Sequence, residues 1–599
     1  MDEKRFIVPG VLACLMMSVL WGPLVGVSRA QEIPPEVLGY ANLVLYNAQV
    51  LTMDRDRPPI TVVEALAVRE GRIMAVGDND RILRMAGPDT VKIDLDGKAV
   101  IPGSVDTHSH PNSYTLRHYG QEINPAYGEY LEANGIRFAT VRWDSNETAL
   151  ADFKRVAESI PAGHWIYATS RQNPTVLNGL TRFDLDEVTP DRPLYVKIGN
   201  AQFGLADSEM LDIVRETYGQ LPPGILVDEQ GVPTGRVFGG AGTLIDQEII
   251  PQIPAEILAP AFKKELEEWV AIGVTTLSTR LKGSEMTAYG QLDRAGQLPL
   301  RIAYSNEIGR DNPYIERSLK RYGDLQGHGT PWMWMIGITV GIPDGTGPAG
   351  RVCTSMEKRE MLPGDLWPDS TCHWELPGFP GADTVRAVNR YGYRVSGVHT
   401  FGDKAYLMML DAFAEASQET SILGRRFALD HGQMITPEVI KRSAELGIIW
   451  SLQPPQYYRS AAIVNRIFGE EYAHRWTMPV RSLIDAGVKV TYGADTHDDP
   501  QRHPMHNLEV LVTRVTQDGR IFGSRERIER AEALLMMTRW GAEYVLREEE
   551  LGSLEPGKLA DLVVLDRSPL DPEVPDEDLS EITVVATLIG GEVAHGSLD

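Results

Sequence analysis

Two patterns of hydrophobic residues divide the chain. Near both ends, short segments alternate apolar and polar residues between Gly, Asp and Asn, as in ANLVLYNAQVLTM (41–53) and ADLVVLD (560–566). Such alternation is typical of β-strands with one buried face. We therefore expect residues 31–100 and 546–599 to build one small β-sandwich domain from both termini.

The middle of the chain, residues 101–545, alternates short apolar segments with amphipathic helical stretches, as repeated βα units do. Several segments are continuously apolar, which fits parallel strands covered by helices on both faces. Eight such repeats favour an α/β fold closed as a (β/α)₈ TIM barrel over an open sheet. The expected strands are 100–107, 273–280, 300–309, 332–340, 393–400, 426–431, 447–453 and 488–495.

One connection is too long for a βα loop. Residues 112–260 separate the first two expected strands and contain the strand-like segments HWIYATS (164–170) and RPLYVKIGN (192–200). We expect this region to be an inserted cap with strands of its own.

The first thirty residues have the order of a secretory signal peptide. Lys4 and Arg5 precede a long apolar run, which ends in the small-residue site at 28–30. A single membrane anchor is the alternative, but prolines interrupt the run. We expect removal of residues 1–30 and a periplasmic or secreted location in a bacterium, with no membrane association afterwards.

The composition limits the kinds of molecule that the chain can bind. With 43% hydrophobic and 24% charged residues, the chain is globular, and its formal net charge of −25 disfavours nucleic acid and anionic membranes. A small-molecule substrate remains. Outside the signal segment the cysteines are Cys353 and Cys372, and the sequence leaves open whether they pair or stay free thiols.

Candidate chemistry begins with a histidine pair. His108 and His110 stand two residues apart at the end of the first expected strand, in DTHSH. Side chains two apart on a strand point the same way, so both imidazoles can face one cation. Imidazole suits zinc and other borderline divalent metals, although an HxH pair alone is weak support.

Three further residues end other expected strands. His399 ends the fifth, His431 the sixth and Asp495 the eighth. In a barrel the carboxyl ends of all strands converge on one mouth, and the eighth strand closes against the first. Each residue alone could be a buried hydrogen-bonded group, but together they predict a metal centre.

These motifs resemble the amidohydrolase superfamily, in particular its large-enzyme branch that includes N-substituted formamide deformylase. The matching segments are IPGSVDTHSH, GVHTFGDKA, LDHGQ, YGADT and GSLEPGKLADLVVLD, and the similarity spans about 42–595. The resemblance implies a metal-dependent hydrolase, in which homo-oligomers are common.

One departure concerns the number of ions. Many members of the superfamily carry a carboxylated lysine at the end of strand four, where it bridges two metals. Here that strand has Ile338 and Thr339 instead, followed by Asp344 in the family's DG pair. The pattern then resembles a mononuclear site, in which one divalent metal, with zinc expected, is held by the four ligands His108, His110, His399 and Asp495.

The predicted reaction is hydrolysis of a C–N bond in an amide, formamide or cyclic amide by metal-activated water. Asp495 is the expected general base and acid, and His431 polarises the substrate carbonyl; His399 is either a ligand or an oxyanion contact. Candidate substrate contacts are His497, Asp344 and Glu307, of which Glu307 could instead pair with Arg310. Ring deamination and a metal-free binding protein are the alternatives, and metal content and ammonia release separate them.

Overall fold

The computed structural model describes residues 39–170, 179–198, 203–344, 352–359, 372–376 and 378–598. The predicted signal peptide lies outside these residues. Ala41–Asp599 form one compact unit.

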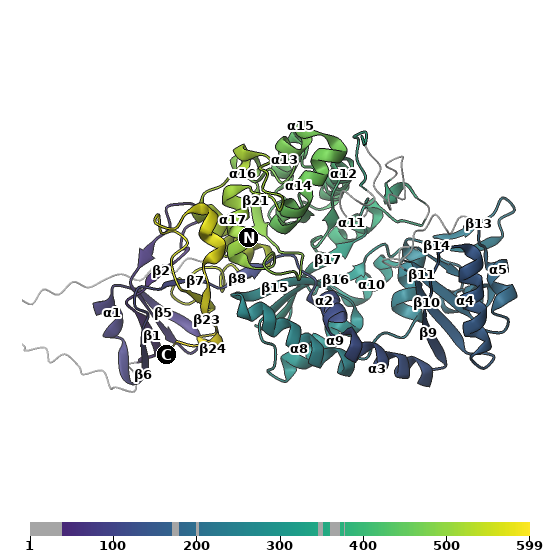
Figure 1. Ribbon diagram of the computed structural model, residues 1–599, viewed down its shortest axis with the longest axis horizontal. Coiled ribbons are helices and arrows are strands. Elements are labelled where there is room, and N and C mark those ends of the chain that lie inside the picture. Colours follow the sequence, from purple (N-terminus) through teal and green to yellow (C-terminus); the bar gives the residue numbers. More distant parts are fainter. Residues whose placement is uncertain are drawn as a thin grey trace, which may run out of the picture. The chain divides into compact units, whose positions relative to one another are not determined.

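The centre of this unit holds two four-stranded sheets whose strands all run parallel. Helices separate the strands along the chain, so the predicted α/β class is confirmed (Figure 1). The first sheet has the order β17 (Met333–Val340), β16 (Arg301–Gly309), β15 (Val274–Leu281), β8 (Ser104–Asp106). The second has the order β18 (His399–Thr400), β19 (Ala428–His431), β20 (Ile449–Leu452), β21 (Lys489–Tyr492).

The margins of the two sheets approach each other. The Thr107 amide donates to the Tyr492 carbonyl at 2.8 Å, and at the other margin Ile338 forms an isolated parallel bridge with Val395. These contacts do not join the sheets into one continuous ladder, and the predicted closed barrel is not confirmed. The strands at the margins are short, β8 with three residues and β18 with two, which leaves little backbone to pair.

Two of the central strands are buried along their whole length. All eight residues of β15 and of β17 are buried, as expected of parallel strands that are covered on both faces. The helices that follow the central strands are α9 (Gly283–Arg294), α10 (Ile315–Tyr322), α11 (Ala382–Arg390), α12 (Asp403–Glu419), α13 (Pro437–Leu446), α14 (Pro454–Phe468), α15 (Glu470–Arg475), α16 (Val480–Asp485), α17 (Pro504–Thr513), α18 (Arg530–Met537) and α19 (Arg539–Tyr544).

Helix α13 shows how the sequence sets these boundaries. The Thr436 side chain accepts from the Val439 amide, and Pro437 occupies the first turn, where no backbone donor is needed. The helix ends at Gly447, whose φ of 63° is left-handed and costs least at glycine.

Two sheets contain the strands near the chain ends: one holds N-terminal strands alone, and the other pairs N-terminal with C-terminal strands (purple and yellow in Figure 1). Leu43, Val50 and Leu562 belong to one buried cluster between them. One sheet has the order β5 (Arg72–Gly77), β4 (Ala65–Arg69), β1 (Ala41–Tyr46), β6 (Ala86–Asp94), with α1 (Asn79–Leu83) after β5. The other has the order β24 (Glu592–Gly596), β23 (Val584–Ile589), β22 (Leu562–Leu565), β7 (Ala99–Pro102), β2 (Gln49–Leu51), β3 (Val62–Val63).

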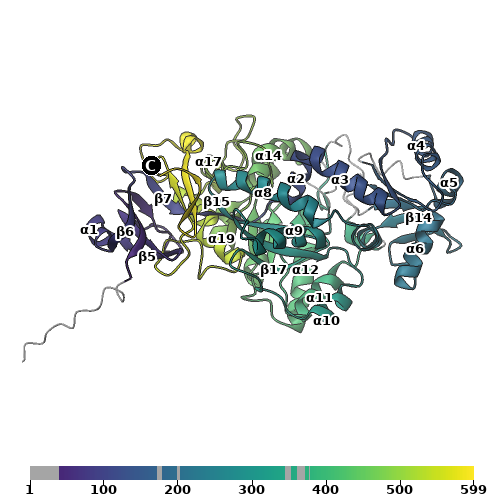
Figure 2. The ribbon, with the colours of Figure 1, turned by 90° about the horizontal axis from the view of Figure 1, so that it is seen from below.

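The long connection carries a six-stranded mixed sheet (blue in Figures 1 and 2). Its order is β13 (Ile225–Val227), β14 (Pro233–Phe238), β12 (Phe203–Ala206), β11 (Leu194–Ile198), β10 (Trp165–Ser170), β9 (Ile136–Thr140). The helices of the connection are α2 (Pro111–His118), α3 (Gly120–Ala133), α4 (Asn146–Glu158), α5 (Arg182–Val188), α6 (Ser208–Tyr218), α7 (Gly240–Leu244) and α8 (Ala255–Ala271).

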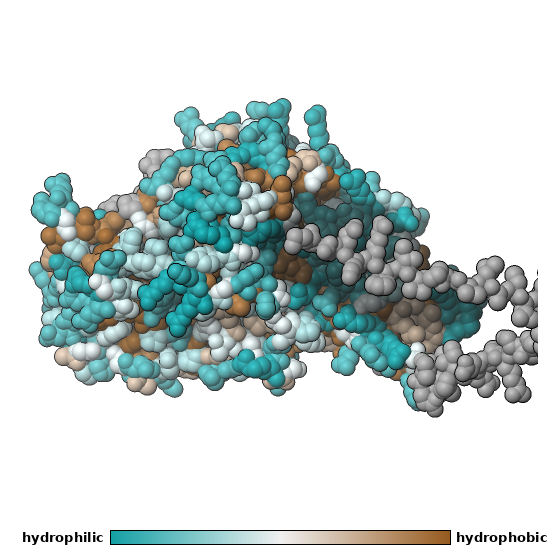
Figure 3. Space-filling model, turned by 180° about the vertical axis from the view of Figure 1, so that it is seen from behind, coloured by the Kyte–Doolittle hydropathy of each residue, from teal (hydrophilic) through white to brown (hydrophobic). Residues whose placement is uncertain are grey.

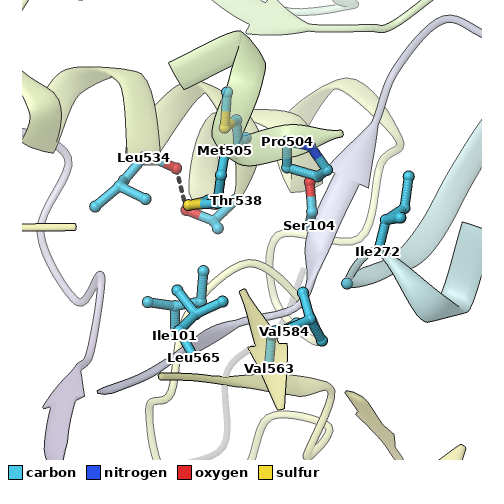
Figure 4. A pocket seen from close by; sticks show the side chains of 12 residues that line it. Ile101, Ser104, Ile272, Pro504, Met505, Leu534, Thr538, Val563, Leu565 and Val584 are labelled. Atoms are coloured by element: carbon cyan, nitrogen blue, oxygen red, sulfur yellow. Dashed lines mark hydrogen bonds between the residues drawn. The ribbon is translucent and has the colours of Figure 1, made fainter. Parts of the chain in front are cut away.

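Beside β8, a pocket opens where strands from both chain ends meet the central helices (Figure 4). Ile101, Val563 and Leu565 line one side, and Met505 and Leu534 the other. Its side chains are almost all apolar, so it offers little for catalysis.

The surface and the cysteines complete the description. Hydrophilic residues cover most of the face in Figure 3, in keeping with the acidic composition. Within the described part of the chain, no helix is long and apolar enough to cross a bilayer. Cys353 and Cys372, whose pairing the sequence left open, form a disulfide.

Candidate metal centre

The two histidines of DTHSH lie just beyond the end of β8 rather than on the strand itself. Their ring centroids are 5.2 Å apart, and the ring of His399 lies 4.8 Å from His108 and 4.9 Å from His110. The three imidazoles therefore gather as predicted, although the turn after the strand, and not strand alternation, brings the pair together.

Asp495 and His431 complete the group. One Asp495 carboxyl oxygen lies 3.6 Å from His108 Nε2 and 3.5 Å from His110 Nε2. The His431 ring lies 4.7 Å from the His108 ring, and its Nε2 is 3.0 Å from His399 Nδ1. Five side chains spread over nearly four hundred positions thus meet at one place.

The donor set fits a divalent cation. His108 Nε2 is buried and has no hydrogen-bond partner among the described residues, although it faces the cluster. The ligand atoms of His108, His110 and His399 lie within 4.8 Å of one another, as do those of His108, His431 and Asp495. Burial lowers the pKa of each histidine, to about 3 at His431, so all are neutral and able to bind metal.

Two residues that the sequence analysis missed support His108 from behind. An Asp430 carboxyl oxygen lies 3.0 Å from His108 Nδ1, and Arg280 forms a fully buried ion pair with Asp430. A carboxylate on Nδ1 directs Nε2 toward the metal and raises its basicity. The sequence did contain a signal for these two residues. Arg280 in LSTR and Asp430 in LDH are charged residues next to a strand end, at positions where the pattern predicts apolar residues.

Asp106 ties the ends of β8 and β21 together. Its carboxylate accepts from the His108 amide at 2.9 Å, from Ser109 Oγ at 2.9 Å and from the Ala494 amide at 3.1 Å. Gly493 lets the strands come this close, because a Cβ there would lie 2.6 Å from His108 Cβ. The histidine turn and Asp495 are therefore held as one rigid piece.

Two residues of the cluster, His431 and Asp495, have unusual backbone dihedral angles. His431 has a φ of 85° and Asp495 a φ of 47°, both in the left-handed region that non-glycine residues rarely adopt. Such conformations persist only where surrounding structure enforces them, and they concentrate at functional sites.

Comparison with known proteins gives this cluster its context. The model of the amidohydrolase family matches residues 92–595, which is most of the chain.

The chain belongs to the amidohydrolase family.

Relatives of this amidohydrolase match over nearly their full length. The N-substituted formamide deformylase of Arthrobacter pascens is 26% identical, and the match covers 92% of this chain and 98% of the deformylase. The LONG AFTER FAR-RED 3 protein of Arabidopsis thaliana is 25% identical, with 96% of each chain covered. Among solved structures, an uncharacterised metal-dependent hydrolase from Pyrococcus furiosus matches with a TM-score of 0.56 and 22% identity over 88% of this chain and 100% of its own, which supports the fold.

The family match and the histidine–aspartate cluster together identify a metal-dependent hydrolase of carbon–nitrogen bonds other than peptide bonds, with a small-molecule substrate.

The residues predicted to contact substrate have different surroundings. The His497 ring lies 5.2 Å from the ring of Tyr114, whose hydroxyl donates to Asp495 at 3.4 Å, so His497 borders the cluster. Glu307 accepts from Arg310 at 3.2 Å, the pairing named as its alternative role. Substrate contact remains a prediction for both residues.

The contacts of Asp344 argue against its predicted substrate role. The carboxylate is fully buried and accepts from the Phe401 amide at 3.2 Å and the Gly402 amide at 2.7 Å. These amides precede α12, whose first donors lack helical partners, so Asp344 holds the segment after His399 in place.

Two residues outside the cluster are buried. Trp334 is fully buried, and its Nε1 donates to the Val545 carbonyl at 2.7 Å. His506 is only 7% exposed, because nearly all of α17 is buried.

Proposed function

We propose that this amidohydrolase binds one zinc ion through His108, His110, His399 and Asp495 and cleaves an amide, formamide or cyclic amide. The observation that carries the proposal is the convergence of these groups around the unpartnered Nε2 of His108. The match to a formamide deformylase over nearly its whole length supports an N-acyl or N-formyl substrate.

A single ion is favoured by the residues around the cluster. Where a bridging lysine would stand, Ile338 is buried and the Thr339 hydroxyl donates to the Ser396 carbonyl at 3.2 Å. In addition, the buried Arg280 guanidinium places a fixed positive charge against His108. A second cation would have to approach this charge without a bridging ligand.

In this proposal each group of the cluster has its own role in the reaction. The ion supplies Lewis acidity that lowers the pKa of a water molecule to near neutrality. Asp495 accepts the water proton and later delivers it to the leaving nitrogen, as general base and then general acid. His431 donates a hydrogen bond to the oxygen that gains negative charge.

We also propose that the two parallel sheets act as a (β/α)₈ barrel whose mouth carries the site, with the described connection between β8 and β15 as its cap. Export to the periplasm or medium, with removal of residues 1–30, is supported by the Cys353–Cys372 disulfide, since disulfides persist in oxidising compartments.

Elemental analysis of the purified protein, followed by a screen of N-formyl and N-acyl amines, tests the function. We expect one zinc per chain and release of carboxylate with the free amine. Ammonia release from ring substrates would instead support a deaminase. A protein that stays metal-free after zinc incubation would be a binding protein and would overturn the proposal.

A further inference from the structure

One side chain in the cluster has no part in the mechanism so far. Gln456, in the first turn of α14, places its Nε2 3.0 Å from His431 Nδ1 and 2.5 Å from the second carboxyl oxygen of Asp495. An amide nitrogen can only donate, so in this arrangement His431 Nδ1 is an acceptor.

The Asp495 carboxylate fixes which end of the Gln456 amide faces the histidine. With the amide turned over, its carbonyl oxygen would face the carboxyl oxygen that now lies 2.5 Å from Gln456 Nε2, and this contact would be repulsive. Gln433 Nε2 donates to Gln456 Oε1 at 3.3 Å and completes the network in this orientation.

We propose that Gln456, oriented by the Asp495 carboxylate, is a positioning residue that holds neutral His431 in the tautomer with its proton on Nε2. A neutral imidazole that accepts at Nδ1 carries its proton on Nε2. This nitrogen lies 3.0 Å from His399 Nδ1, so the proton points into the cluster. His431 therefore acts as a hydrogen-bond donor and not as a metal ligand.

The rest of the surroundings holds the ring plane. Phe401 stacks on the His431 ring with centroids 4.2 Å apart and planes inclined by 14°. The Gln453 side chain also lies against His431, and its own Nε2 donates to the Ser451 carbonyl at 3.0 Å. Stacking thus sets the orientation of the ring, and the Gln456 amide sets the position of its proton.

This inference rests on the proposed function for its kinetic consequence but not for the tautomer itself. The tautomer is measured by ring ¹⁵N chemical shifts of the full-length, zinc-loaded protein labelled at histidine nitrogen, with His431→Asn to assign the signal. We expect a protonated Nε2 and an unprotonated Nδ1 at His431.

Two variants change the network without altering a proposed ligand. Gln456→Met keeps the length of the side chain and removes the donor, so nothing at that position then holds the His431 proton on Nε2. Gln433→Met removes the contact to Gln456 Oε1 and leaves the Asp495 contact in place; it is the matched control and should keep the wild-type tautomer.

We expect Gln456→Met to lower kcat by about 10²–10³-fold, the usual effect of losing one oxyanion donor, with KM and zinc content within twofold of wild type. A wild-type protein with the proton on Nδ1, a Gln456→Met protein with an unchanged tautomer, or a loss of zinc that explains the lost activity would each overturn the inference. If the wild type hydrolysed no amide, the proposed function would fail, while the tautomer measurement would still decide the role of Gln456.

Discussion

The segment after β21 lies so close to the histidine turn that adding one methyl group, at Gly493, should damage the metal site. A Cβ at Gly493 would lie 2.6 Å from His108 Cβ and 2.7 Å from its backbone nitrogen. Ordinary contact begins at 3.4 Å, so His108 or the strand must move by about 0.8 Å, the difference between 3.4 and 2.6 Å. Backbone atoms are involved, so a change of side-chain rotamer cannot relieve the overlap.

We therefore expect Gly493→Ala to damage metal binding more than stability. Overpacking of this kind costs about 1–3 kcal/mol in folding. Metal sites tolerate distance errors of only about 0.2 Å, so the shift should weaken zinc binding by at least the roughly 10–100-fold seen when ligand support is lost. Zinc affinity by competition with a chromophoric chelator and the thermal midpoint of the zinc-free protein separate the two effects.

Gly128→Ala is the matched control. Gly128 lies within α3, and a methyl group added there would meet no heavy atom within 4 Å, so alanine should raise stability by about 0.5–1 kcal/mol and leave zinc affinity unchanged. A Gly493→Ala protein with wild-type zinc affinity would refute the proposed role of the close approach.

Three further predictions follow from buried groups. Asp495→Asn should lower kcat by about 10²–10⁴-fold with an unchanged circular dichroism spectrum, because the base is lost and the size is kept; near wild-type turnover would exclude Asp495 as the base. Asp344→Ala should cost about 1–3 kcal/mol for each of the two amides it leaves unpaired, measured by denaturant unfolding against an exposed control such as Asp411→Ala; equal stabilities would exclude the supporting role. Burial lowers the pKa of His506 from 6.5 to about 4, so the unfolded chain binds more protons between these values and stability should fall as the pH drops from about 6.5 to about 4. His506→Leu should flatten this part of the stability profile, and an unchanged profile would contradict the assignment.

The sequence determined the elements and the identities of the central residues. Period-two segments near the ends and apolar runs between helices follow from local burial, so the strands at 274–281, 301–309 and 333–340 agree with expectation. His431 ends β19, Asp495 follows β21, and His399 lies in the two-residue β18, so the predicted strand ends led to all three. The closed barrel was not confirmed, because pairing at the sheet margins depends on the lengths of β8 and β18, which hydrophobicity does not encode.

Only the tertiary structure showed what supports the cluster. Arg280 and Asp430 are 150 positions apart, and Gln433 lies in the turn after β19 whereas Gln456 lies in α14, so no local pattern links either pair. The left-handed backbone of His431 and Asp495 is likewise imposed by neighbours that are distant in sequence. Local periodicity reflects which face of a strand is buried, whereas the partner of a buried charge or amide is set by how the chain closes on itself, and the sequence alone gives no measure of that.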